Sequence, residues 1–157
     1  MYNVADLIKS KGDTVWTVHS KKKVSDALQL MADKDIGAVL VVDRTKGITG
    51  IFSERDYARY SILHRDYDVC PLDLPVDDLM SKEVIYINDT KTIEDCTRLM
   101  SSKHLRHIPV LHDGELSGII SITDLVNTLL RKQDFIIDQM EQYISGENPT
   151  YFYRDHP

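Results

Sequence analysis

The stretch GIFSERDYAR at residues 50–59 has a near copy in GIISITDL at residues 118–125, and this pair decides the fold. Each stretch is typical of an apolar strand that ends in serine and leads directly into a helix. A shift of 69 residues also places VSDALQLM (24–31) on IEDCTRLM (93–100), and the shift falls to 68 within the turn-rich segment 43–47. The chain is therefore predicted to be a duplication whose length change lies in a turn, where such changes are tolerated.

Each copy is predicted to form one β-α-β-β-α unit. The elements expected in the first copy are a strand at 15–18, a helix from 24, strands at 39–42 and 48–52, and a helix at 56–63. The first helix has apolar residues at helical spacing, and the run at 39–42 is β-branched, as in buried strands. Ser20 in the first copy and Asp89 in the second are expected to cap that helix.

One such unit is too small to bury both faces of its sheet, so the two units are expected to pack together. The predicted fold class is α/β (α+β), with two pseudo-symmetric repeats packed sheet to sheet and flanking helices near 4–10 and 128–144. The predicted divisions are 1–70 for the first repeat with the N-terminal helix, 71–131 for the second repeat, and 132–157 for a C-terminal helix and tail. The apolar stripe of the last helix suits either packing on the module's own core or a dimer contact.

The composition argues against several classes of protein. A net charge of −6 argues against a nucleic-acid binder, and no apolar run approaches the roughly 20 residues of a membrane span. The start of the sequence has no basic region followed by an apolar core, so no secretory signal is expected. Cys70 and Cys96 lack the spacing of metal ligands and are expected to be reduced, in a cytoplasmic protein.

The two quoted stretches, together with LRHIPV at 105–110, resemble the cystathionine-β-synthase (CBS) domain. Two such domains in tandem form a Bateman module, and the resemblance covers about residues 4–130, most closely to the small stand-alone bacterial type. It implies a cleft between the repeats with two pseudo-symmetric sites for AMP, ADP, ATP, NAD(H) or S-adenosylmethionine. It also implies modules that commonly form homodimers and whose packing, or that of a regulated partner protein, changes when ligand binds.

The resemblance assigns residues to both sites. The second site would use Ser121, Thr123 and Asp124, with Trp16, Ile36, Gly37 and Ala38 opposite. A carboxylate at a cleft mouth can accept hydrogen bonds from ribose hydroxyls, and the start of a helix can receive a phosphate. A serine followed by an acid three residues later is also a capping box, and the spacing alone does not separate capping from binding.

The first site would use Ser53, Arg55 and Asp56, with Ile85, Leu105, Arg106 and His107 opposite and Arg59 one helical turn further on. Arg55 stands where the family pattern has a serine or threonine, which exchanges a hydroxyl for a phosphate donor. Arg55, Arg106 and His107 are expected to meet the phosphate charge. His104, His107 and His112 lack any supporting ligand pattern, so no metal is expected.

The sequence therefore predicts a regulatory module for signal transduction that binds an adenosine nucleotide, with AMP as the first choice of ligand. No phosphate-binding loop, nucleophile elbow or zinc-protease motif is present, so the protein is predicted not to be an enzyme. The alternative is an adaptor that binds no ligand, dimerises and regulates a partner protein. Neither nucleic acid nor a membrane is an expected partner.

Overall fold

The structure is a computed structural model that describes residues 3–66 and 68–145. The first half contains α1 (Val4–Lys11), β1 (Thr17–His19), α2 (Val24–Lys34), β2 (Ala38–Asp43), β3 (Gly47–Ser53) and α3 (Glu54–Leu63). A short 3-10 turn (Pro71–Asp73) and α4 (Val76–Leu79) lead into β4 (Ile87–Asn88), α5 (Ile93–Ser102), β5 (His107–His112), β6 (Glu115–Ser121) and α6 (Ile122–Ser145). The predicted tail at 146–157 lies outside the described residues.

The strands form two three-stranded sheets of the same topology, in the orders β1-β2-β3 and β4-β5-β6. In each sheet the first pair of strands is parallel and the second pair is antiparallel. Each antiparallel pair also has a register shift at the same place, after Val41 in β2 and after Val110 in β5. The predicted duplication and the α/β fold of two pseudo-symmetric repeats are therefore confirmed.

Helices α2 and α5 begin where the sequence predicts, but the predicted caps are wrong. Ser20 and Asp89 are buried three residues before the capping positions, and their main-chain oxygens accept hydrogen bonds from α4 and α1. Thr92 caps α5 instead and forms a capping box with Asp95. Lys23 precedes α2 without a side-chain cap. Thr92 lies directly before α5, so its side chain reaches the N–H groups of the helix start, whereas Asp89 lies three residues further back.

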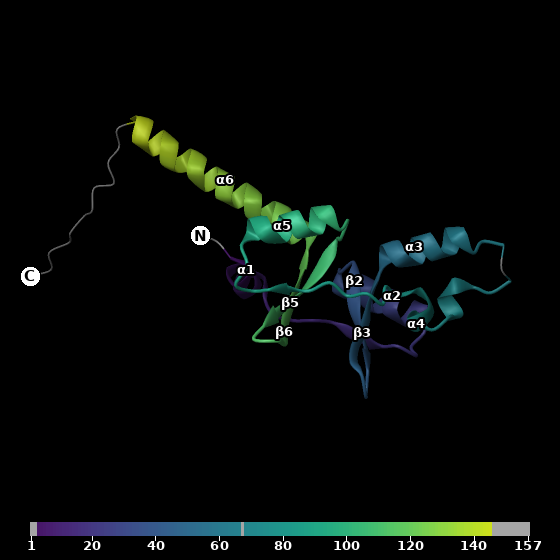
Figure 1. The fold of residues 1–157 in the computed structure, drawn as a ribbon. Helices are drawn as coiled ribbons and strands as arrows, with labels where there is room; N and C mark the ends of the chain where they lie inside the picture. Colours follow the sequence, from purple (N-terminus) through teal and green to yellow (C-terminus); the bar gives the residue numbers. More distant parts are fainter. Residues whose placement is uncertain (1–2, 67, 146–157) are drawn as a thin grey trace, which may run out of the picture.

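The short helix before each repeat packs on the other half of the molecule. Val4, Leu7 and Ile8 of α1 belong to the core of the second repeat, and Figure 1 shows α1 beside β5 and β6. Val76 and Leu79 of α4 belong to the core of the first repeat. The division predicted at residue 70 stays a prediction, and the packing of α1 and α4 crosses it.

Two equivalent glycines allow α1 and the segment that ends α4 to pack closely on the sheet of the other repeat. A Cβ on Gly118 of β6 would lie 2.6 Å from Cδ1 of Ile8, and a Cβ on Gly50 of β3 would lie 2.5 Å from Sδ of Met80. The same Cβ at residue 50 would lie 2.9 Å from the main-chain oxygen of Ser81. That oxygen is fixed, because Ser81 and Ile51 exchange two main-chain hydrogen bonds at 2.9 and 3.0 Å. The strand therefore requires glycine here because of a close approach.

We expect Gly50→Ala to destabilise the protein by about 1–3 kcal/mol, because the new methyl group must displace backbone as well as Met80. Gly118→Ala serves as the comparison and should cost less, because only the side chain of Ile8 opposes it. Urea unfolding of both variants measures the difference. Equal stability of Gly50→Ala and the unmodified protein would show that the segment at Met80 and Ser81 is not held against β3.

The last helix is longer than the flanking helix predicted near 128–144. α6 runs without interruption from residue 122 to residue 145, since neither glycine nor proline interrupts it. Leu125 is fully buried near its start, whereas residues 131–144 are all exposed. Figure 1 shows this second part extending away from the body. Of the helices that the structure describes, none combines the length and apolar character of a membrane span.

Candidate functional site

A large hollow, with a volume of about 860 Å³, lies between the two repeats. Its walls come from both halves of the chain: Lys11, Thr14, Trp16, Asp35, Ile36, Gly37 and Ala38 on one side, and Arg106, His107, Ile119, Ser121, Ile122, Thr123 and Asp124 on the other. The structure brings together all seven residues predicted for the second site. The volume of this hollow falls in the usual range for small-molecule sites.

Ser121 and Asp124 hold the start of α6. The Asp124 main-chain N–H donates to Ser121 Oγ at 3.2 Å, and the Ser121 N–H and hydroxyl donate to Asp124 Oδ2 at 2.7 and 2.8 Å. This reciprocal pair is the capping box that the spacing suggested, and it occurs at a wall of the hollow. Capping and ligand contact are compatible, because a carboxylate has two oxygens and the cap uses only Oδ2.

Asp124 has a further partner that comes from the other end of the chain. Lys11, at the end of α1, donates to Asp124 Oδ2 at 2.6 Å. Burial opposes ionisation of Asp124, but the bonds from Lys11 and Ser121 outweigh it and hold its pKa below the ordinary value. The hollow thus contains a carboxylate anion that is already paired with a lysine.

The opposite wall combines a flat ring with the main chain at the start of β2. Gly37 and Ala38 form the edge where β2 begins, and Trp16 precedes β1. Trp16 is 36% exposed and does not fill the hollow, and the Lys34 ammonium lies 4.4 Å from the centre of its ring. A planar base could therefore lie against the indole and close to the main chain.

His107 sits where the repeats meet and lines both the large hollow and a smaller one. Its ring lies close to the first repeat, since a Cβ on Gly37 would be 3.3 Å from His107 Cε1. Burial, aided by the nearby charge of Lys11, lowers the pKa of His107 to about 4. His107 is therefore neutral near pH 7, and its predicted contact with a phosphate stays a prediction.

This burial makes the stability of the fold depend on pH. Between pH 6.5 and about pH 4 the unfolded chain binds a proton that the folded chain does not, so the free energy of unfolding falls as pH falls through that window. We expect His107→Gln to remove this part of the loss, on the order of 2 kcal/mol between pH 7 and pH 4.5. Urea unfolding of both proteins at the two pH values measures it. If both lose the same free energy, His107 is not held neutral in the fold.

The predicted first site is assembled but small. Ser53, Arg55, Asp56, Ile85, Leu105, Arg106 and His107 all line a hollow of about 100 Å³. Arg59 is exposed on α3 and lines neither this hollow nor the large one. The two predicted sites are therefore unequal in size, although the residues around them are related by the repeat.

Side chains of the first site form hydrogen bonds with one another, with the main chain of the second repeat and with the segment that follows α4. Arg55 donates from Nη1 to the main-chain oxygen of His104 at 2.9 Å, which ties α3 to the second repeat. Asp56 accepts from Ser53 through Oδ2 and from Ser81 through Oδ1 at 3.2 Å. Both carboxylate oxygens of Asp56 thus have partners, whereas Asp124 uses Oδ2 for all three of the bonds described above.

Sequence reasoning missed several residues of the large hollow. Lys11 and Thr14 lie in and after α1, which the repeat pattern assigns to the first half. Arg106 was assigned to the small site but lines both. Among the residues at 3–66 and 68–145, no group of three or more histidine, cysteine, aspartate or glutamate residues could hold a metal ion.

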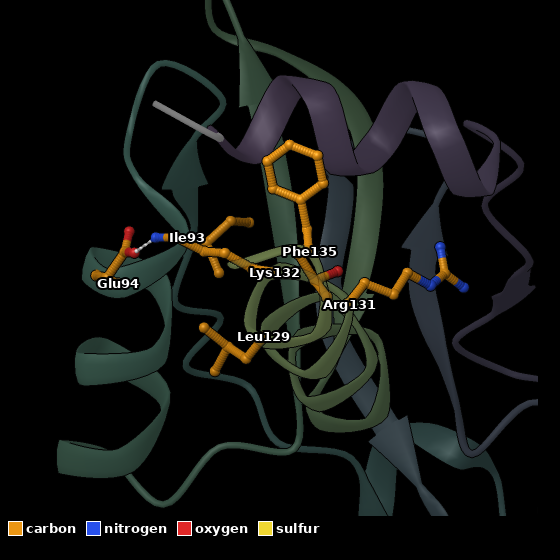
Figure 2. A pocket seen from close by; sticks show the side chains of 7 residues that line it. Ile93, Glu94, Leu129, Arg131, Lys132 and Phe135 are labelled. Atoms are coloured by element: carbon orange, nitrogen blue, oxygen red, sulfur yellow. Dashed lines mark hydrogen bonds and ion pairs between the residues drawn. The ribbon is translucent and has the colours of Figure 1, made fainter. Parts of the chain in front are cut away.

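A separate hollow of about 320 Å³ lies between α5 and the base of the projecting part of α6. It is lined by Ile93, Leu129 and Phe135, and Figure 2 shows Lys132 reaching across to Glu94, at 2.6 Å. None of the predicted site residues lies in it. The ion pair anchors the base of the projecting helix on α5.

The sequence and the structure both match CBS-domain proteins. The family model for the CBS domain matches residues 4–63 and 76–131. A mitochondrial CBS domain-containing protein of Arabidopsis thaliana, CBSX3, is 28% identical over 91% of this chain and 72% of its own length. A CBS-domain protein of known structure from Burkholderia ambifaria MC40-6 is 40% identical over 83% of this chain and 96% of that chain, with a TM-score of 0.76. The crystal structure of CBSX2 in complex with AMP has a TM-score of 0.64 at 25% identity, over 85% of this chain and 99% of that one.

Proposed function

The chain belongs to the CBS-domain family, with two CBS domains in tandem, and we propose that it is a regulatory module that binds an adenosine nucleotide and catalyses no reaction. One observation carries the proposal: the hollow of about 860 Å³ between the repeats gathers Asp124 and its neighbours opposite Trp16 and the edge of β2. AMP is the proposed ligand, and its complex with CBSX2, a relative 25% identical to this chain, supports that choice.

In the proposed complex, Asp124 accepts hydrogen bonds from the ribose hydroxyls, because an ionised carboxylate makes strong charge-assisted bonds. The adenine lies between Trp16 and the main chain at Gly37 and Ala38, which line the same wall of the hollow. The phosphate lies near the start of α6, where the helix dipole favours an anion. Lys11 and Arg106 are the lysine and arginine that line the hollow, so they are the proposed cations for that phosphate.

The sizes of the hollows predict how many ligands bind. A hollow of about 100 Å³ is well below the volumes that small-molecule sites usually have, whereas about 860 Å³ is ample for one nucleotide. We therefore propose one nucleotide per chain, at the site that Asp124 marks, with Arg55 and Asp56 acting as a structural link between the repeats. Binding would regulate by favouring one arrangement of the repeats over another.

We expect AMP to raise the thermal unfolding midpoint by several degrees, because a ligand at about 100 times its dissociation constant adds about 2.7 kcal/mol of stability. Trp16 is the single tryptophan of the sequence, so its fluorescence should report the same binding directly. Asp124→Ala should abolish the thermal shift and the fluorescence change. Asp56→Ala is the matched control, since it removes the equivalent carboxylate of the small hollow, and it should leave both signals in place.

The opposite pattern would reject the assignment. If Asp124→Ala retained the full response while Asp56→Ala lost it, the nucleotide would bind at the first site. If AMP, ADP, ATP, NADH and S-adenosylmethionine all failed to stabilise the protein, the adaptor that binds no ligand would be favoured instead. We expect the module to work as a homodimer in either case, as the resemblance to the family implies.

A further inference from the structure

An ion pair between the first and the last helix lies in the wall of the large hollow. Lys11, the last residue of α1, donates from Nζ to Asp124 Oδ2 at 2.6 Å, and both residues line the hollow. Their side chains are 29% and 24% exposed, so water and salt screen this pair less than they screen a pair on the open surface. The charge of Lys11 therefore acts inside the hollow, where the ligand proposed above would lie.

The fold fixes the positions of both partners of this ion pair. The apolar side of α1 packs in the core of the second repeat, which holds the backbone that carries Lys11. Asp124 is held as well, because it forms the capping box of α6 with Ser121. Both charges thus come from anchored helices, and a ligand in the hollow would meet the ammonium and the carboxylate where the fold places them.

Asp124 has one carboxylate oxygen left for a ligand. Oδ2 accepts hydrogen bonds from Lys11 and from Ser121, whereas Oδ1 accepts none of the hydrogen bonds found among residues 3–66 and 68–145. A ribose hydroxyl can therefore bind to Oδ1 while Lys11 stays on Oδ2. Because the ribose ring is small, the ammonium of Lys11 then also lies near the group that the 5′ carbon of the sugar carries.

Lys11 decides the balance of charge in the hollow. The charged residues that line the hollow are the cations Lys11 and Arg106 and the anions Asp35 and Asp124. His107 adds no charge near pH 7, because burial lowers its pKa to about 4. Arg106 and Asp35 are exposed, so solvent screens both of them. Without Lys11, the partly buried carboxylate of Asp124 would be uncompensated, and the hollow would attract a cation.

We propose that Lys11 makes the large hollow select adenosine ligands by the charge of their 5′ group: a phosphate is favoured, an uncharged thioether binds less tightly, and a sulfonium is disfavoured. AMP, 5′-methylthioadenosine and S-adenosylmethionine carry these three groups. The ammonium attracts the phosphate and repels the sulfonium, and Asp124 does not offset that repulsion, because its charge is already paired with Lys11. This selectivity rests on the nucleotide site proposed above and narrows the ligands that the family resemblance implies.

Isothermal titration calorimetry of the full chain with each of the three ligands tests the proposal. We expect AMP to bind the unmodified protein most tightly and S-adenosylmethionine least tightly. Lys11→Met should lower the ratio of the S-adenosylmethionine Kd to the AMP Kd by about tenfold or more, because the two ligands have opposite charge. Lys11→Arg keeps the charge and should keep the order. The matched control is Lys9→Met, at an exposed residue of α1 that does not line this hollow, and it should change the ratio by less than about twofold.

The outcomes separate the charge selectivity from the site itself. If the ligands bind but Lys11→Met leaves the ratio unchanged, or if the unmodified protein prefers S-adenosylmethionine to AMP, the selectivity is overturned and the nucleotide site stands. If none of the three ligands binds, both are overturned.

Urea unfolding checks the ion pair without any ligand. We expect the double variant Lys11→Met, Asp124→Asn to lose less free energy of unfolding than the two single variants lose together, because either substitution alone already removes the pair. Strictly additive losses would show that Lys11 is not held at Asp124 in solution, and this result would also overturn the selectivity.

Discussion

The packing of α1 onto the second repeat is the contact on which the rest of the structure depends. Ile8 lies over Gly118, where a side chain on the strand would leave no room. α4 makes the equivalent contact on the first repeat, so each sheet is covered by a helix that precedes the other repeat in the sequence. Neither repeat has a complete core without this exchange, and the two halves are therefore bound to fold together.

This exchange also shapes the electrostatics of the large hollow. Because α1 crosses to the second repeat, Lys11 reaches Asp124, a residue 113 positions away in the sequence. The positive charge of Lys11 and burial together keep His107 neutral, while Lys11 helps to keep Asp124 ionised. The hollow thus presents a paired anion, an uncharged imidazole and the guanidinium of Arg106, which is a polar but nearly balanced lining.

α6 connects that lining to the outside of the molecule. Its first turn is fixed by the capping box of Ser121 and Asp124, its next turns pack through Leu125, and its last turns project beyond the body. The proposed nucleotide site and the projecting part of α6 therefore belong to one continuous helix.

The sequence by itself determined the duplication and the order of the strands along the chain, because both follow from local patterns and from the symmetry of the repeat. The gathering of Ser121 and Asp124 opposite Gly37 was implied by the resemblance to the CBS domain and not by a local pattern. The caps of α2 and α5 were assigned to Ser20 and Asp89 incorrectly, because the sequence cannot tell which side chain the folded helix start reaches.

Only the tertiary structure decided which of the two pseudo-symmetric hollows is large. Arg55 bonds to the main chain of His104 and Asp56 bonds to Ser81, and these contacts occupy the side chains of the small hollow. Lys11 enters the other hollow because α1 packs across the repeats. Such differences arise from contacts between residues far apart in sequence, and repeated local patterns carry no information about them.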